Sequence, residues 1–548
     1  MTRPAGTTTG QLGFTPQQAT RWLNPRQLFR TAVAVLLADI FGAYADKREL
    51  QQCGVFTQAV FGHGGDELWL DYVSDLGDGF DATYSVASLV AQDQLTVDGA
   101  TPALPRGDVL VLGGDEVYPV ADAFAYEART TRVYAAALPE TPGPRPVLYA
   151  LPGNHDWYDG LTAFLRVFAQ GEAIGGWDTA QRRSYFGLRL PRRWWLLAVD
   201  IQLDTYIDGP QLAYFRGVAE EIRPGDGVIL CTAKPSWYPR AHGDGNSLAR
   251  LEYFARKVLA GTGAHLRLVL TGDSHHYARY TAEGSGQTLL TGGLGGAYTS
   301  ATHHLDESLT LSPRLDRPGD RGTEPVTYRL APKTWPPRER SRRMALDVVV
   351  LPFRNRGFWA LLGAVQAAFM TALLTSGLLW TASVALVMVL AAVGFAAPTR
   401  GGILPRLRLG VPHGLAHLLL GGAAGAACAA AGPGWPVGIA VAVATPVVGL
   451  LSAEVVAAYL WFASRRRAHV NELFAAQSRE DYKGFVRMHI GPEGVRVYPI
   501  GLRRVADRWS ARPDGAPGDP WLEPAEPLRP ELIEEPFLVT REPAPPPP

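Results

Sequence analysis

The stretch VLVLGGDEVYP at residues 109–119 decides the fold. Its apolar run, residues 109–112, has the length of a strand, and the two glycines that follow begin a turn that carries Asp115. Short apolar runs bounded by glycine and proline predict buried strands, and α/β enzymes place reactive groups in the turns after such strands. A single Gly-Asp turn is common, so the prediction depends on whether the pattern recurs.

The pattern recurs three times, as WLDYVSDLGDG at residues 69–79, VLYALPGNHD at residues 147–156 and LVLTGDSHHY at residues 268–277. Each apolar run ends in Asp, Asn or His within a tight turn. We therefore expect the four turns to meet at one edge of a β core, where their side chains would suit cations that prefer oxygen ligands.

Composition narrows the class of protein. The chain has 548 residues, enough for two or three domains, and Lys plus Arg equal Asp plus Glu at 52 each. This balance gives no indication of a nucleic-acid partner. Three widely spaced cysteines indicate a reducing compartment and no structural zinc site. No apolar stretch of the signal-peptide type follows Met1, so we expect the first domain to start in the cytoplasm.

The four turns resemble the motifs of the calcineurin-like metallophosphoesterase superfamily, which run in the order D-x-H or D-x-G, GD, GNH[DE], H-x-P and GHxH. The chain has DLG at residues 75–77, GD at 114–115, GNHD at 153–156 and GDSH at 272–275, in that order. The resemblance implies an α/β (α+β) fold, a β-sandwich flanked by helices, with two divalent metal ions at its loop edge. The metals would be Mn, Fe, Zn or Mg, with the identity left open.

The resemblance also assigns roles to residues. Asp115 matches the carboxylate that bridges the ions, Asp75 and His275 match ligands of the first ion, and Asn154 matches a ligand of the second. His155 matches the histidine that contacts phosphate and protonates the leaving group, and Asp156 would orient its imidazole.

Three departures from the family pattern affect the metal sites. Gly77 replaces the histidine of D-x-H, as in the purple acid phosphatase branch, where GDxxY supplies a tyrosine ligand instead. Tyr118 has that spacing and is the candidate ligand; a tyrosine packed beside Pro119 is the alternative. Ala233 stands where the H-x-P histidine belongs, and Asp273 replaces the first histidine of GHxH. We therefore expect the second metal site to be weak.

Other side chains would have to compensate for the missing histidine. Lys234 and His276 are candidates for binding the substrate phosphate, and His276, His242 or a water could take the empty metal position. For Lys234, a solvated surface position is the alternative.

A long apolar region follows the first domain. Residues 357–399 contain no charged residue, which allows two membrane spans of about 20 residues each. Two further spans are predicted, and Glu454 lies inside the fourth. An acid within a span is either functional, or it forms a hydrogen bond to a neighbouring helix or lies near the membrane interface, and these readings stay open. Arginines precede the first span, follow the fourth and lie between the second and third. Because positively charged residues favour the cytoplasmic side, both ends of the membrane region are predicted to be cytoplasmic.

The predicted organisation therefore has six parts: a polar segment and an amphipathic helix, the phosphoesterase domain, a Pro/Arg-rich linker, four membrane helices, a helix and β-hairpin that dock on the main domain, and a disordered Pro-rich tail. These parts span residues 1–60, 61–310, 311–353, 354–464 (helices 357–375, 378–397, 413–431 and 437–463), 465–512 and 513–548, respectively.

The predicted function is hydrolysis of phosphate ester or pyrophosphate bonds by a metal-bound hydroxide. The protein would be integral to the plasma membrane, with its catalytic domain in the cytoplasm. Its substrate would be phosphorylated, and a lipid-linked phosphate is one candidate. The alternative is a degenerate phosphoesterase domain that acts as a membrane sensor or scaffold without turnover, which the alanine at position 233 motivates.

Overall fold

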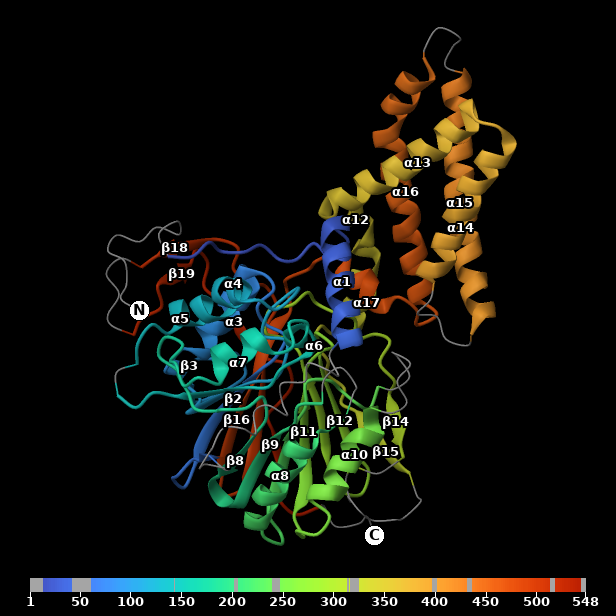
Figure 1. Ribbon diagram of the computed structural model, residues 1–548. Helices are drawn as coiled ribbons and strands as arrows, with labels where there is room; N and C mark the ends of the chain where they lie inside the picture. The colour runs from blue at the N-terminus through green and yellow to red at the C-terminus, as the bar shows by residue number, and fades with distance from the viewer. Residues whose placement is uncertain are drawn as a thin grey trace.

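The apolar runs that precede the four turns form adjacent strands of two stacked β-sheets. The computed structural model describes residues 13–41, 61–141, 143–201, 206–238, 247–312, 315, 325–396, 402–430, 436–512 and 518–543. Figure 1 shows the two sheets beside a bundle of long helices. His242 and residues 1–12 and 42–60 of the predicted N-terminal part lie outside the described residues.

The first sheet contains the strands that lead into three of the four turns. Its order is β20 (Pro530–Leu532), β17 (Gly494–Leu502), β16 (Lys483–Gly491), β2 (Leu68–Val73), β5 (Val109–Leu112), β6 (Val147–Ala150) and β7 (Asp178–Thr179), with β21 (Phe537–Val539) also paired to β17. Because β2, β5 and β6 are parallel, their carboxyl ends lie at the same edge of the sheet.

The second sheet supplies the fourth turn. Its order is β1 (Phe61–Gly62), β8 (Phe186–Leu190), β9 (Trp194–Ala198), β10 (Gly227–Cys231), β11 (His265–Thr271), β13 (Thr288–Gly292), β12 (Tyr277–Ala282), β15 (Val326–Leu330) and β14 (Ser308–Leu311). Strands β9, β10 and β11 are parallel, and the turn that carries Asp273 and His275 follows β11.

Alternation along the strands builds a core on each side of the first sheet. Leu70 and Tyr72 of β2 point between the sheets, where they pack with Ile229 and Leu270 of the second sheet. Val73, the next residue, packs on the opposite face against helices.

Helices cover the outer faces of both sheets. On the first sheet lie α3 (Phe80–Val90), α5 (Arg132–Ala137) and α7 (Thr162–Phe168), and on the second lie α8 (Gly209–Glu221) and α10 (Ser247–Val258). This confirms the predicted β-sandwich flanked by helices.

The C-terminal hairpin is part of the first sheet, because β16 pairs with β2 along five residues. The Arg487 guanidinium on β16 donates two hydrogen bonds to the Asp71 carboxylate on β2, at 2.7 and 2.8 Å, and both side chains are buried. The tail differs from its predicted disorder, since residues 518–543 include β20 and β21, which pair with β17 through backbone hydrogen bonds.

Residues 311–353 also differ from a simple linker. They contain β15, helix α11 (Arg338–Met344), the 3-10 helix η6 (Ala345–Val350) and the start of α12 (Leu351–Arg354). Strand β15 lies in the second sheet, between β12 and β14. The prolines and arginines of this region therefore separate short elements.

Four long apolar helices form the bundle beside the sheets (Figure 1): α13 (Arg356–Thr375), α14 (Leu378–Phe395), α15 (Ile403–Ala430) and α16 (Val437–Ser464). Within the described residues, these four are long and apolar enough to cross a membrane, which supports the predicted membrane anchoring. Helix α15 begins ten residues before its predicted start and continues through Pro412. Glu454 is half-buried on α16.

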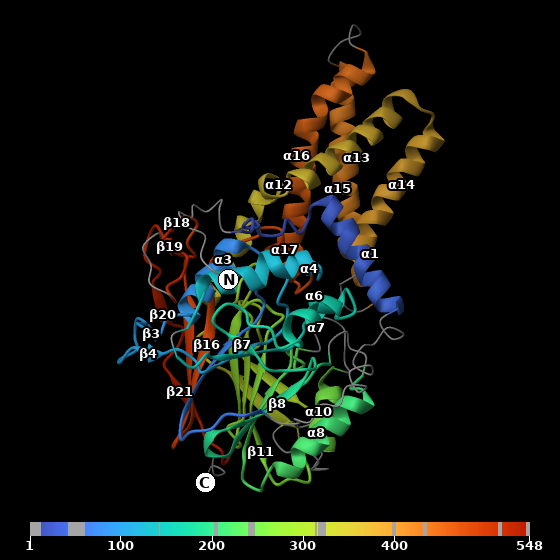
Figure 2. The same ribbon diagram turned by 60° about the vertical axis from the view of Figure 1, so that its left-hand side comes forward.

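The helix predicted after residue 24 is α1 (Pro25–Phe41), and it is largely unpacked. Its side chains Leu28, Phe29, Leu36 and Ile40 are exposed, and Figures 1 and 2 show it between the sheets and the bundle. The edge of the sheets that carries α6 (Asn154–Trp157) faces this junction in both views.

Candidate active site

The four turns meet at the carboxyl edge of the sheets and are held together by hydrogen bonds that backbone N–H groups donate. Asp75 N donates to Gly114 O at 2.9 Å, which joins the turns after β2 and β5. Asp273 N donates to Asp75 Oδ2 at 2.9 Å, which joins the turn after β11 to the turn after β2. His155 N donates to Asp115 Oδ1 at 2.9 Å and so attaches the turn after β6.

The backbone of these turns adopts a conformation that non-glycine residues rarely occupy. The φ angle is 62° at Asp75, 54° at Asp115, 62° at Asp273 and 47° at His275. Each such residue costs on the order of 1–3 kcal/mol, and such strain is concentrated at functional sites. Glycine permits the close approach of the turns, since a Cβ on Gly153 would lie 2.1 Å from Asp115 Oδ1.

The Tyr118 hydroxyl is the point where the candidate ligands converge. It lies 3.0 Å from Asp75 Oδ1, 3.0 Å from Asp115 Oδ2 and 3.1 Å from His275 Nε2. The gap between His275 Nε2 and Asp75 Oδ1 is 3.5 Å. The structure thus brings together the four residues predicted for the first metal ion.

Burial and mutual repulsion make the two carboxyl groups hard to ionise without a cation. Burial, then the charge of Asp273, raises the pKa of Asp75 to about 8. Burial, then the charges of Asp75 and Asp156, raises the pKa of Asp115 well above its usual range. A cation would favour the ionised form of both groups.

The donors around Tyr118 fit one divalent cation in their chemistry, since carboxylate, phenol and imidazole groups can all ligate a metal of the predicted types. Among the described residues, however, no three His, Cys, Asp or Glu side chains already form a coordination cluster. The Tyr118 hydroxyl lies among the two carboxylates and the imidazole, so the predicted ligand set depends on a tyrosine.

The residues predicted for the second ion fit less well. Ala233 is buried, and its Cβ would lie 2.8 Å from a Cβ placed on Gly114, so a methyl group stands beside the loop that carries Asp115. Asn154 Nδ2 donates to the Tyr158 hydroxyl at 2.8 Å. The donor set for a second cation is therefore reduced.

His155 lies beside the Tyr118 hydroxyl cluster, with a ring-centroid distance of 4.4 Å to Tyr118. Its Nδ1 lies 2.7 Å from the carbonyl oxygen of Pro119, so a proton on Nδ1 would be donated there and Nε2 would be left as an acceptor. Burial lowers the pKa of His155 to about 4, which makes the imidazole neutral near pH 7.

Asp156 does not orient this imidazole, contrary to the prediction. Its Oδ2 accepts hydrogen bonds from Gly153 N at 2.8 Å and Glu116 N at 3.3 Å, and its Oδ1 accepts one from the Tyr126 hydroxyl. The carboxylate therefore fixes the turns after β5 and β6, and the Pro119 carbonyl takes the orienting position.

The two candidates for phosphate binding lie at the edges of the site. Lys234 is half-buried in the turn after β10. His276 is buried, its Nδ1 lies 2.7 Å from Ser274 O, and its ring faces Tyr238 at 6.5 Å. The Ser274 carbonyl therefore holds the His276 ring within the turn after β11.

Sequence reasoning missed Trp22, which lies over the site. Its indole ring contacts the rings of His155, Tyr118 and Tyr298 edge-on, at centroid distances of 5.6, 5.9 and 5.8 Å. Residues 13–24 hold it there as an extended strap: Thr20 N donates to Asp78 Oδ1 at 2.7 Å, and Leu23 N donates to Asn355 Oδ1 at 3.3 Å. This segment has no periodic pattern that could have indicated its place.

Lys483 at the start of β16 was also missed. It is fully buried, donates to Thr299 Oγ1 at 2.9 Å, and has its pKa lowered to about 8 by burial. Its charge opposes protonation of His275. The C-terminal hairpin therefore brings a positive charge close to the predicted metal ligands.

Comparison with known proteins identifies a family for part of the chain. Residues 68–277 match the profile of the family described as calcineurin-like phosphoesterase. No curated protein matches the chain. Among solved structures, "GAP50 the anchor in the inner membrane complex of Plasmodium" aligns with 13% sequence identity and a TM-score of 0.31, covering 43% of this chain and 74% of the other.

Proposed function

Because residues 68–277 form a calcineurin-like phosphoesterase domain, we propose that this chain is a membrane-anchored, metal-dependent hydrolase of phosphate ester or pyrophosphate bonds. One observation carries the proposal: Asp75, Asp115 and His275 converge on the Tyr118 hydroxyl, and His155 lies beside it. Asp75, Asp115, His275 and Tyr118 would hold a first divalent ion. Asn154 and Asp273 would add to Asp115 at a weaker second site.

The chain's own residues would position the substrate and move a proton. A divalent cation supplies Lewis-acid activation of water and neutralises phosphate charge. With Nδ1 held by Pro119 O, His155 Nε2 is the atom that exchanges a proton with a substrate oxygen. Lys234 at the rim would attract the phosphate, and Trp22 would exclude water from the space over His155.

The position of the site favours a lipid-linked phosphate as substrate. Figures 1 and 2 show α6, which carries His155, at the end of the sheets that faces the helical bundle. Arg354 and Arg356 at the start of the first span and Arg465 to Arg467 after the fourth favour a cytoplasmic position for the domain in a plasma membrane.

The proposal is tested with the full chain in nanodiscs and Mn²⁺. A lipid phosphate in the disc and a soluble aryl phosphate are offered separately, and phosphate release is measured. We expect hydrolysis of both, faster for the lipid, and a loss of about 100-fold or more for His155→Ala. Faster turnover of the soluble ester would reject the lipid-linked substrate but leave the proposed hydrolase activity standing.

A second candidate function is a membrane sensor or scaffold without turnover. Two observations favour it: the hydroxyl of Tyr118 already joins the predicted ligands, and Ala233 brings no donor to the second site. Fewer than one metal ion per chain, together with no turnover of either ester, would support this function.

A further inference from the structure

A small basic cavity lies where the strap of residues 13–24 meets the first membrane helix. It measures about 300 Å³, and its polar lining consists of Arg21, Asn24, Arg354, Asn355 and Arg356. The lining contains no acidic residue. Among the described residues, neither Arg354 nor Arg356 forms an ion pair, so their charges are available to an anion.

The walls of this basic cavity are fixed by a buried asparagine. Asn355 Nδ2 donates to Ala476 O at 2.7 Å, while Asn355 Oδ1 accepts from Leu23 N at 3.3 Å. Because the side chain is used in this way, it makes no capping hydrogen bond to α13. The first-turn N–H groups of this 20-residue helix, at Arg356 and the residue after it, therefore remain favourable to an anion.

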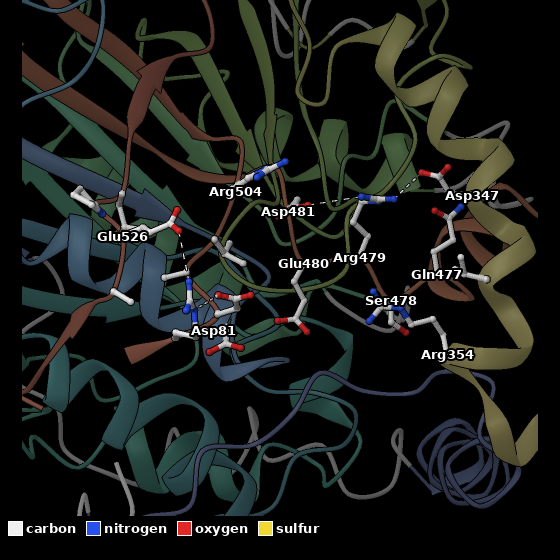
Figure 3. A pocket seen from close by; sticks show the side chains of 18 residues that line it. Asp81, Asp347, Arg354, Gln477, Ser478, Arg479, Glu480, Asp481, Arg504 and Glu526 are labelled. Atoms are coloured by element: carbon white, nitrogen blue, oxygen red, sulfur yellow. Dashed lines mark hydrogen bonds and ion pairs between the residues drawn. The ribbon is translucent and has the colours of Figure 1, made fainter. Parts of the chain in front are cut away.

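The larger cavity next to it has the opposite character. It measures about 790 Å³ and shares Arg354, but two of its other guanidiniums, those of Arg479 and Arg508, are paired with carboxylates. Figure 3 shows Arg479 between Asp347, at 2.7 Å, and Asp481, at 3.7 Å. An anion would meet repulsion from these carboxylates, whereas the basic cavity contains only positive charge.

With α13 as a membrane span, the basic cavity would lie at the level of the membrane surface. Arg356 is the first residue of a candidate span. Directly before it, the apolar side chains of Leu346, Val349 and Phe353 are 55%, 58% and 60% exposed, which places them toward lipid. Arginines at this depth meet the phosphate groups of phospholipids.

We propose that the basic cavity binds the phosphate of an anionic phospholipid headgroup. The guanidiniums of Arg354 and Arg356 and the start of α13 would hold the phosphate, and Arg21 would approach it from the strap. Trp22, the next residue, lies over His155, so a bound lipid would hold the strap across the candidate active site. This lipid is distinct from a substrate, and the proposal does not depend on catalysis.

The test measures lipid retention by the full chain, using native mass spectrometry after release from nanodiscs of phosphatidylglycerol or phosphatidylcholine. Arg354→Gln with Arg356→Gln removes two charges from the cavity. Arg465→Gln with Arg466→Gln is the matched control, since these interface arginines stack on Trp461 and Phe462 at 4.0 and 4.2 Å.

We expect the native chain and the control to retain phosphatidylglycerol in preference to phosphatidylcholine, and the cavity variant to retain at least about tenfold less. The variant with Arg354→Lys and Arg356→Lys keeps both positive charges and should retain most of the lipid. Its retention would show that substitution at these two positions does not by itself unfold the chain. Equal losses in cavity and control variants, or unchanged retention in the cavity variant, would overturn the proposal. Displacement of the lipid by millimolar glycerol 3-phosphate would also overturn it, in favour of a site for a soluble phosphate.

Discussion

The Tyr118 hydroxyl lies 3.0 Å from Asp115 Oδ2, within hydrogen-bonding distance, in the space where the strand-end turns meet. A tyrosine in this position can act in two ways: it can ligate a cation, or it can occupy the place of one. Because the second site is predicted to be weak, this distinction is central: the first site would have to bind the cation with little help from the second.

Tyr118→Phe should weaken Mn²⁺ binding by about tenfold or more, because the variant removes one of four predicted donors. Binding is measured by isothermal titration of the detergent-purified chain. Tyr126→Phe is the matched control, because the Tyr126 hydroxyl bonds to Asp156 instead. Tighter binding in Tyr118→Phe would show that the hydroxyl blocks the cation.

Trp22→Ala should expose His155. Burial is the cause of the low pKa of His155, about 4, so a more open site should raise this pKa towards the usual 6.5. We expect the carbethoxylation of His155, followed by mass spectrometry, to become several-fold faster at neutral pH. Phe124→Ala, at a side chain that is 67% exposed, should leave the rate unchanged. If His155 reacted equally slowly in Trp22→Ala and in the native chain, the assignment of Trp22 as a cover over His155 would be contradicted.

Arg487→Met should destabilise the chain by about 3–5 kcal/mol, since it leaves the Asp71 carboxylate buried without its partner. The measurement is the free energy of unfolding in urea at fixed detergent concentration. Arg343→Met breaks an ion pair with Glu339 whose side chains are 68% and 77% exposed, and it should cost less than about 0.5 kcal/mol. Similar costs for the two variants would argue against a hairpin integrated into the first sheet.

Glu480 should make stability depend on pH. Burial raises its pKa from 4.5 to about 7, so the folded chain holds this proton more tightly than the unfolded chain. The contribution is fully present below pH 4.5 and is lost as the pH rises through about 7. Glu480→Gln should therefore flatten the fall in thermal midpoint across this window. An unchanged slope in the variant would contradict the assignment.

The sequence predicts the positions of Asp75, Asp115 and His275 because parallel strands end at one sheet edge, so turns far apart in the chain become neighbours. The fold is confirmed, and residues 68–277 match the predicted family. The ligand and catalytic roles of these residues stay predictions, as does the cytoplasmic position of the domain.

Asp156 shows where adjacency in sequence misleads. Successive side chains on a helix point about 100° apart, so on α6 the imidazole of His155 faces the site while the carboxylate of Asp156 faces Glu116 and Tyr126. Trp22 is held by a hydrogen bond from Leu23 N to the side chain of Asn355, 332 positions away. The tail strands β20 and β21 pair with β17, which lies tens of residues earlier in the chain. Composition and periodicity contain no information about such contacts.

The most direct test of the central claim is phosphate release from an aryl phosphate by the full chain, first stripped of metal with EDTA and then supplied with Mn²⁺. The account predicts no release after stripping, recovery with Mn²⁺ bound at one or more ions per chain, and a loss of about 100-fold or more in Asp115→Asn. Turnover that persists after stripping, or equal turnover in Asp115→Asn, would contradict it.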